Sequence, residues 1–533
     1  MRRIDGGKER VLTRGGLTDV VPKGRRSKAC REKSAEVIVL PRWSAGRTET
    51  YGGDATATET VTSKSRKSPR RRRPEQYRRN REDTAGAMKD LRRAREQHHQ
   101  AWTNEMIDLE TILARDNLNK AYKAVVRNKG SSGIDGMEVE DLLDHLKLHG
   151  ADLIENIKAG RYQPSAVRRV YIPKENGKKR PLGIPTVVDR FVQQAVAQVL
   201  SAEYETVFCD GSHGFRPKRS CSSAIDQALA YANDGDVWVV DVDLAQFFDT
   251  VNHGKLLQVL SKRVKDRRVI KLVHKMLRAP VSESGVIEKR EIGTPQGGPV
   301  SPVLANILLH ELDVELEARG HKFVRYADDL MVMCRSRKAA ERTLERIRPF
   351  IEETLFLQIN VEKTKICHIA DRELKFLGFG FWRKVRKEGR SLILVRPHQK
   401  SLAKCKARLK ELTSRNRGQS LDEFRRDLRR YLVGWVNYFG RSSMKKFIAD
   451  TDPWLRRRIR MVYWKQWKKP SMRIRALRKL GVPDGKAYEW GSSRRGYWRV
   501  AGSWVLATSL TNDFLRQKGW ICLQDAYRMR PAT

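Results

Sequence analysis

The chain has 533 residues, 40% of them hydrophobic and 32% charged, and 108 Lys and Arg against 63 Asp and Glu give a formal net charge of +45. A chain of this length and apolar content can bury at least two cores, which excludes a wholly disordered basic tail. No stretch approaches the roughly 18 to 20 apolar residues of a membrane span, and no secretory signal follows the first residues. We therefore expect a soluble, cytoplasmic protein with no membrane partner.

The positive charge is concentrated at the two ends of the chain. Residues 1–100 carry 27 basic and 13 acidic side chains, and residues 395–533 carry 34 and 10, which leaves a net charge of only +7 for the residues between. Like charges repel one another and oppose compaction, so two basic ends predict a partner of high negative charge. A nucleic-acid backbone fits this requirement better than a membrane surface, because the sequence has no lipidation signal.

Cysteine spacing argues against a metal ribbon or a disulfide framework. The seven cysteines are scattered, and none forms a Cys-x-x-Cys pair. Reduced, mostly packed thiols are therefore expected.

The first hundred residues are rich in Gly, Ser, Thr and Arg and predict a flexible basic extension. Globular structure is expected from about residue 101, because apolar residues recur at helical spacing from Ile107 to Val125. Residues 167–173 and 178–184 then predict two strands joined by a hairpin turn at Asn176-Gly177.

Three aspartates stand at the ends of predicted strands. Asp243 ends the β-rich segment 236–243, while Asp328 and Asp329 lie between the apolar segments 322–326 and 330–333. Adjacent strand residues face opposite ways, so two neighbouring aspartates serve one site most easily in a hairpin turn. Carboxylates grouped in this way suit a phosphoryl-transfer site with two Mg²⁺ ions, whereas a lone Asp-Asp turn is more often only solvated.

Helices are predicted in the remainder of the chain. Ser301-Pro302 has the residue types of a helix start and Gly320 those of a helix end. After about residue 400 the pattern is chiefly helical, with an apolar stripe from Phe424 to Trp435.

Several ordered motifs share one resemblance. Residues 243–249 (Asp-Leu-Ala-Gln-Phe-Phe-Asp), 293–302 (Gly-Thr-Pro-Gln-Gly-Gly-Pro-Val-Ser-Pro) and 326–329 (Tyr-Ala-Asp-Asp) resemble the successive palm motifs of reverse transcriptases. With Ile-Pro-Lys at 172–174, Arg-Pro-Leu-Gly-Ile-Pro at 180–185 and His-Gly-Phe-Arg-Pro at 213–217, the chain resembles the group II intron reverse transcriptase/maturase family.

The resemblance implies a catalytic and metal-binding set. Asp243, Asp328 and Asp329 would be catalytic and bind two Mg²⁺ ions, with the backbone carbonyl of Leu244 as a further metal ligand. Asp241 shares the face of Asp243 but lies roughly 6.5 Å back along the strand, so we expect it to support the site rather than bind metal.

A dNTP site is implied as well. Arg168, Lys174 and Arg180 match positions that contact the triphosphate, Phe248 matches the aromatic residue on which the incoming sugar packs, and Gln296 lies against the nucleotide or template. A solvated basic hairpin is the alternative for the three cations, and an ordinary core position is the alternative for Phe248.

After residue 390 the chain resembles the thumb, or domain X, that grips intron RNA. The implied RNA-binding residues follow one helix and are Arg456, Arg457, Arg458, Arg460 and Lys465. A merely solvated face is the alternative, and for Trp435 a core position is favoured over base stacking. Residues 492–499 resemble the short tail of family members that lack an endonuclease. An HNH endonuclease would also need histidines, and none follows His398.

These patterns predict an α+β fold of the right-hand polymerase type, with fingers and palm built on a mixed sheet and an α-helical thumb. Four segments are expected: a basic extension at 1–100, fingers and palm at 101–390, thumb and domain X at 391–485, and a basic segment without an HNH endonuclease at 486–533.

The resemblance implies an RNA-directed DNA polymerase that uses dNTPs with an RNA template and primer. It would bind its group II intron RNA, assist splicing and copy the intron into a DNA target. The resemblance is to bacterial proteins of the group IIC type, which implies association with the nucleoid when the protein is bound to DNA. The alternatives are a reverse transcriptase of a retron, diversity-generating or defence system, and a non-catalytic RNA-binding splicing factor.

Overall fold

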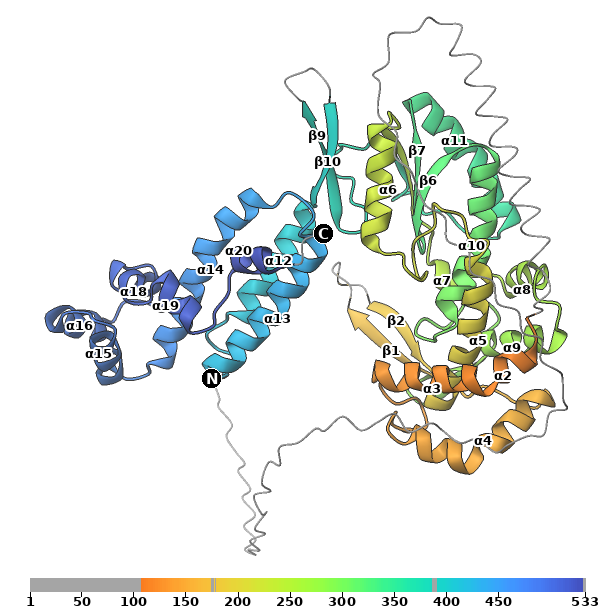
Figure 1. The fold of residues 1–533 in the computed structure, drawn as a ribbon, viewed down its shortest axis with the longest axis horizontal. Helices are drawn as coiled ribbons and strands as arrows, with labels where there is room; N and C mark the ends of the chain where they lie inside the picture. The colour runs from red at the N-terminus through yellow and green to blue at the C-terminus, as the bar shows by residue number, and fades with distance from the viewer. Residues whose placement is uncertain (1–106, 174–176, 178, 386–390, 531–533) are drawn as a thin grey trace, which may run out of the picture.

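The structure is a computed structural model that describes residues 107–173, 177, 179–385 and 391–530 (Figure 1). The expected extension at 1–100 and Lys174 lie outside the described residues.

Four helices form a small layer, of which three precede the first sheet in the chain and one follows its first two strands. Its helices are α2 (Leu109–Leu113), α3 (Arg115–Asn128), α4 (Leu142–Lys158) and α5 (Val187–Glu205). The helical pattern predicted from Ile107 to Val125 is divided at Ala114, whose extended backbone ends α2 and begins α3. The buried faces of α3 and α5 pack together in the first hydrophobic core.

The first sheet has the strand order β2-β1-β4-β5. Strands β1 (Val167–Pro173) and β2 (Lys179–Ile184) pair antiparallel, as the hairpin pattern predicted. Strand β4 (Val281–Glu283) joins β1 in parallel and pairs antiparallel with β5 (Val286–Glu288), so this sheet is mixed.

The second sheet carries the three aspartates. Its order is β6-β7-β3-β8, from β3 (Trp238–Val242), β6 (Lys322–Tyr326), β7 (Asp329–Cys334) and β8 (Lys365–His368), and every pair is antiparallel. Val240 and Val242 enter the first core, whereas Val239 enters a second core on the opposite face. A strand buried on both faces accounts for the continuous apolar run in the sequence.

Helices surround this sheet and connect its strands. They are α6 (Cys221–Asn233), α7 (Phe247–Thr250), α8 (His253–Ser261), α9 (Arg267–Leu277), α10 (Ser301–Ala318) and α11 (Arg337–Pro349), continued by the π-helical turn Phe350–Thr354. Helix α10 begins as predicted with proline in its first turn, but its N-cap is Val300 rather than Ser301. The Ser301 hydroxyl donates instead to the carbonyl of Pro295, which ties the helix start to the preceding glycine-rich loop.

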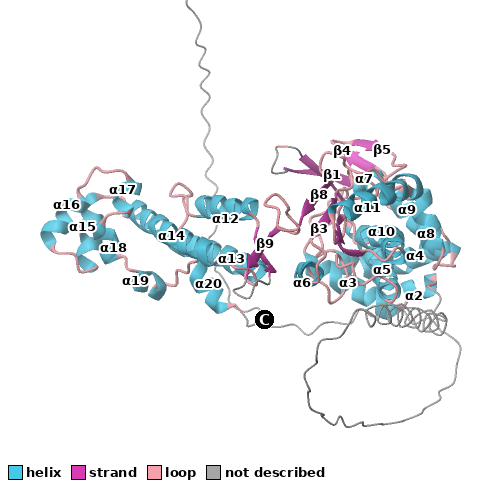
Figure 2. Cartoon of the chain, turned by 90° about the horizontal axis from the view of Figure 1, so that it is seen from above, coloured by secondary structure: helices cyan, strands magenta, loops and turns pink. Residues whose placement is uncertain are grey.

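A two-stranded hairpin of β9 (Phe379–Val385) and β10 (Ser391–Pro397) leads into a helical region (Figure 2). The helices that follow are α12 (Gln399–Leu412), α13 (Leu421–Phe439), α14 (Lys445–Gln466), α15 (Pro470–Lys479), α16 (Asp484–Gly491), α17 (Tyr497–Ala501), α18 (Trp504–Ser509), α19 (Asn512–Gln517) and α20 (Leu523–Met529). The predicted stripe on α13 is buried at Phe424, Leu428 and Leu432, and it belongs to the second core.

Candidate nucleotidyl-transfer site

The three aspartates gather at one end of the second sheet. Val242 of β3 lies opposite Leu330 of β7, so the next pair in the same register is Asp243 and Asp329. Asp328 lies in the two-residue turn between β6 and β7, where Ala327 takes a left-handed backbone with φ 58°. The antiparallel pairing therefore brings together two sequence segments that are more than 80 residues apart.

The carboxylates of this cluster repel one another, and this repulsion contributes to the raised pKa values of two of them. Burial and the negative charges of Asp328, Asp241 and Asp243 together raise the pKa of Asp329 to about 6, while Lys375 opposes the shift. The Asp329 side chain keeps an exposed surface beside these three carboxylates, whose negative charges favour its protonated form. Burial also raises the pKa of Asp241 to about 6, with Lys365 opposing the shift and Asp243 adding to it.

Asp243 is held by the segment that precedes β8. Its amide donates to Thr364 Oγ1 at 3.2 Å, and its carbonyl accepts from the Asn360 amide at 2.8 Å. Lys363 Nζ lies 2.7 Å from the carboxylate Oδ2, which is buried but has no hydrogen bond of good angle. Lys363 thus balances the charge of Asp243 and leaves lone pairs of its carboxylate free. Lys363 lies outside the motifs that predicted the site.

The backbone of Leu244 faces the cluster. The amide of Ala245 donates to Gln358 and the carbonyl of Asp243 accepts from Asn360, both on the far side of the strand from β7. Because backbone groups alternate in direction along a strand, the carbonyl of Leu244 points toward the β7 side, where Asp328 lies.

These residues fit hard divalent cations by their chemistry, since carboxylate and carbonyl oxygens are the ligands that Mg²⁺ prefers. Repulsion among four carboxylates is also relieved by a cation. Within the described part of the chain, no three His, Cys, Asp or Glu side chains already stand at metal-ligand spacing, so the carboxylates would have to rearrange around an ion.

A buried arginine that the sequence analysis missed fixes the aspartate turn. Arg325, at the end of β6, is 1% exposed and pairs with the equally buried Asp313 of α10. Its guanidinium also donates to Asn306 Oδ1 at 2.9 Å, to Ser212 Oγ at 2.8 Å and to the carbonyl of Ala327 at 3.0 Å. Arg325 thereby joins α10 and the loop before α6 to the turn that carries Asp328.

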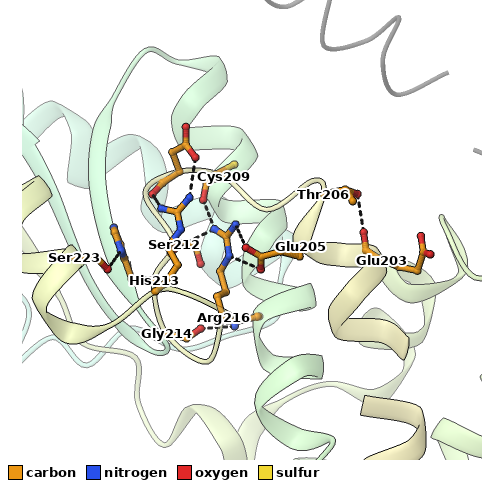
Figure 3. Close-up of polar contacts among 12 residues, drawn as sticks. Glu203, Glu205, Thr206, Cys209, Ser212, His213, Gly214, Arg216 and Ser223 are labelled. Atoms are coloured by element: carbon orange, nitrogen blue, oxygen red, sulfur yellow. Dashed lines mark hydrogen bonds and ion pairs between the residues drawn. The ribbon is translucent and has the colours of Figure 1, made fainter. Parts of the chain in front are cut away.

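The loop before α6 contains the His-Gly-Phe-Arg-Pro motif and is itself built on buried polar contacts (Figure 3). Arg216 donates to the carbonyls of Cys209 and Ser212 and pairs with Glu205 at 3.0 Å. His213 bonds through Nδ1 to Ser223, which caps α6. The motif is therefore a structural support placed directly against the aspartate turn, since a Cβ on Gly214 would collide with the amide of Ala327.

The Gly-Thr-Pro-Gln-Gly-Gly loop joins β2 of the first sheet to α7. Gln296 Oε1 accepts from Arg180 Nε at 2.8 Å, and Gln296 Nε2 donates to Asp249 Oδ2 at 3.2 Å. Gly297 has φ 133°, and a Cβ on it would collide with the carbonyl of Gly183. Glycine is thus required here by both backbone conformation and close approach.

The other predicted nucleotide contacts are placed in different ways. Arg180 is exposed on β2, whereas Arg168 of β1 donates to the carbonyl of Ser132 at 2.6 Å and leaves its Nε buried without a partner. Phe248 is half-buried on α7, 5.2 Å from the ring of Phe247. A hollow of about 390 Å³ opens beside Asp249, with Arg169 and Arg290 among its lining residues.

The predicted arginine row on α14 is largely engaged within the protein. Arg457 donates to the carbonyl of Trp498, Arg458 to Thr413 and the carbonyl of Lys410, and Arg460 to the carbonyl of Leu510. Arg456 is half-buried as well, and Lys465 is exposed. A merely solvated face, the alternative to RNA contacts, is therefore wrong for these arginines, because segments from before and after α14 in the chain pack over the helix.

The fold has an antiparallel sheet with an acidic end, a mixed sheet, a glycine-rich loop and a basic helical region. Together these features define a right-hand polymerase of the reverse transcriptase class. Residues 172–381 match the family of reverse transcriptases, described as RNA-dependent DNA polymerases. Residues 402–481 match the maturase-specific domain of group II introns.

Relatives agree with these matches. The chain is 34% identical over 321 residues to Protein YkfC of Escherichia coli strain K12. The aligned region covers 53% of this chain and 84% of YkfC. It is 32% identical over 350 residues to the group II intron-encoded protein LtrA of Lactococcus lactis subsp. cremoris. That alignment covers 52% of this chain and 56% of LtrA. The chain belongs to the group II intron reverse transcriptase/maturase family, as its motifs predicted.

Among solved structures, a chain of the partial Cas6-RT-Cas1–Cas2 complex matches with a TM-score of 0.30 and 24% identity, over 48% of this chain and 42% of that chain. In the part of the chain that the structure describes, no helix is both long and apolar enough to cross a membrane.

Proposed function

We propose that this protein synthesises DNA on an RNA template by a two-metal mechanism, binds its parent group II intron RNA, assists its splicing and copies it into a DNA target. The observation that carries the catalytic part is the convergence of Asp243, Asp328 and Asp329 at one end of the second sheet. Pure RNA binding gives no reason to gather carboxylates beside a polyanion, so this convergence favours a polymerase over a non-catalytic splicing factor.

The three carboxylates and the carbonyl of Leu244 would hold two Mg²⁺ ions. When bound, such ions lower the pKa of a primer 3′-hydroxyl and offset charge on the α-phosphate of a dNTP. The role of the chain is positioning: Arg325 fixes the turn that carries Asp328, and the segment before β8 fixes Asp243.

The dNTP would lie between the two sheets. Arg180, oriented by Gln296, would contact the triphosphate as a fixed cation, with Arg168 and Lys174 as further proposed contacts. Gln296 joins Arg180 to α7, and α7 carries Phe248, the proposed platform for the sugar. Attack by the primer hydroxyl then displaces pyrophosphate from the α-phosphate.

We further propose the functional division already expected from the sequence, with fingers and palm at 101–390, the RNA-gripping thumb and domain X at 391–485, and a basic terminal segment at 486–533. The match of the maturase-specific domain to residues 402–481 supports an RNA-binding role for the second of these segments.

One experiment tests both halves of the function. The purified chain is mixed with the RNA encoded around its own gene, and splicing at low Mg²⁺ and primer extension on that RNA are measured side by side. We expect the protein to stimulate both reactions. Primer extension without any stimulation of splicing would contradict the maturase role, and splicing without extension would contradict the polymerase role.

A further inference from the structure

A hollow between three helices of the basic region has the composition of a nucleobase site. It is lined by Ala403, Lys406, Ala407 and Lys410 of α12, by Trp454 and Arg458 of α14, and by Trp498 of α17. Its volume is about 440 Å³, within the range of roughly 300 to 1,000 Å³ that is typical of small-ligand sites.

The aromatic residues of this hollow are reachable and surrounded by positive charge. Trp498 is 37% exposed, and the guanidinium of Arg457 lies 4.1 Å from the centre of its ring. Lys406 Nζ and the Arg458 guanidinium lie 5.4 and 5.3 Å from the centre of the Trp454 ring. Among the described residues that line the hollow, none is acidic.

The hollow is also firmly built. Arg458 donates to Thr413 Oγ1 at 2.6 Å and to the carbonyl of Lys410 at 2.8 Å, which fixes α14 against the end of α12. Arg457 donates to the carbonyl of Trp498 at 2.8 Å, which fixes α17 on α14. The two indoles are therefore held in place before any ligand arrives, and two exposed alanines keep space open in front of them.

We propose that this hollow binds one unpaired base of an RNA strand, stacked on Trp454 or Trp498, with the adjoining phosphates on Lys406 and Lys410. Flat aromatic surfaces accept any base, and lysines beside them neutralise the backbone. A base within an A-form duplex is stacked and paired, so it cannot reach the indoles, whereas a bulged or looped base can. The proposal rests on the RNA-binding part of the proposed function and adds that this part distinguishes unpaired from paired RNA.

The test uses the full chain and two short RNA hairpins that differ by a single 2-aminopurine bulge. We expect the parent protein to bind the bulged hairpin about tenfold more tightly and to quench its fluorescence. Ala407→Leu, which fills the hollow, and Trp498→Ala, which removes one indole but keeps the backbone carbonyl that Arg457 binds, should both abolish this preference. Affinity for the unbulged hairpin and primer extension on an unstructured template should stay within about twofold of the parent.

Trp504→Ala is the matched control, because Trp504 is 54% exposed but does not line the hollow, and it should leave the preference intact. Thermal unfolding of each variant verifies that it is folded. Equal affinity of the parent for both hairpins, or an unchanged preference in both hollow variants, would overturn the proposal while primer extension continued. Displacement by an acidic, tyrosine-containing peptide but not by bulged RNA would assign the hollow to a protein partner and would also overturn it.

Discussion

At the scale of single residues, the carboxylate cluster is arranged at an electrostatic cost. Asp329 has a pKa of about 6 because of burial and the charges of Asp328, Asp241 and Asp243. Its folded pKa thus lies above the ordinary value of 3.8, so the metal-free fold loses stability as the pH rises from about 4 through 6 and Asp329 ionises. A cation that binds the ionised cluster removes this penalty.

Replacement of Asp329 by Asn should therefore stabilise the metal-free protein at pH 7.5. We expect a rise in Tm on the order of 2 °C in the presence of EDTA, since removal of one charge relieves part of the repulsion at a partly exposed site. The difference from the parent should narrow as the pH falls toward 4, where the folded parent is protonated at this position. Differential scanning calorimetry across this pH range measures the effect, and a pH-independent difference would contradict the proposed repulsion.

Gly297 permits the contact between the glycine-rich loop and β2. Gly297→Ala should destabilise the fold by about 1 to 3 kcal/mol, because the new Cβ collides with the carbonyl of Gly183. It should also raise the KM for dNTPs several-fold. The displaced loop carries Gln296, and Gln296 accepts the hydrogen bond that orients Arg180.

Gly235→Ala is the control for this prediction, because Gly235 also has a positive φ, at 104°, but open space in front of it. Urea unfolding and steady-state primer extension separate the two effects. If both variants behaved alike, backbone strain alone would explain the result and the close approach would have no role.

At the scale of elements, Arg325 connects α10 and the loop before α6 to the aspartate turn. The Arg325→Met variant leaves Asp313 buried without a partner, and we expect a loss of stability of about 3 to 5 kcal/mol. Primer extension should fall as well, because the carbonyl of Ala327 loses its donor. Urea unfolding at pH 7 gives the first quantity, and single-turnover extension gives the second.

An exposed ion pair provides the comparison for Arg325. Arg219 and Asp210 lie 3.0 Å apart, but Asp210 is 75% exposed, so Arg219→Met should cost about 1 kcal/mol or less. In the double variant Arg325→Met/Asp313→Leu, the loss should be smaller than the sum of the single losses. Additive losses would show that the buried pair does not act as a unit.

Local sequence patterns predicted the elements that position the site, but not the contacts between distant segments. Short β-rich apolar runs predicted β3 and the β6–β7 hairpin, and Asp243 and Asp329 follow from the strand ends. Arg325 looked like an ordinary strand residue, because its partner Asp313 lies on a helix whose packing the strand sequence does not encode. Lys363 was missed for the same reason, since its contact with Asp243 spans 120 positions.

The arginine row of α14 shows the limit of helical patterns. Four arginines in five positions predict a row of RNA contacts, or else a merely solvated face, when the helix is considered alone. In the fold, Arg457 and Arg460 bind carbonyls 41 and 50 positions later in the chain. Short helices near the end of the chain, which have weak periodicity, thus decide whether the row is exposed.

At the scale of the whole molecule, the positive charge is unevenly distributed and its exposed part is accessible to RNA. Residues 395–533 carry 34 basic side chains against 10 acidic ones. Lys465, Lys468 and Lys469, at the end of α14 and just after it, are exposed, in contrast to the half-buried arginines. These lysines are therefore the cleaner choice for a test of electrostatic RNA binding.

Replacing Lys465, Lys468 and Lys469 together by Gln should weaken intron RNA binding at low salt and flatten its salt dependence. Loss of three phosphate contacts should reduce the magnitude of the slope of log K against log salt by about 2 to 3. Filter binding between 50 and 300 mM salt measures this slope.

The triple Arg456, Arg457 and Arg458 variant should also lower the salt slope, but it should lose stability because its inter-helix hydrogen bonds are removed. If the slope of log K against log salt were equal for the lysine variant and the parent, this end of α14 would be excluded from the RNA interface.

The most direct measurement on the polymerase assignment compares primer extension with RNA binding in one substitution, Asp328→Asn. Because Asn keeps the shape of Asp but lacks its charge, extension should fall at least about a thousandfold, while intron RNA affinity should stay within about twofold of the parent. This result would place Asp328 in the chemistry and not in RNA recognition. DNA synthesis retained near the parent rate would contradict the aspartate site proposed for this protein.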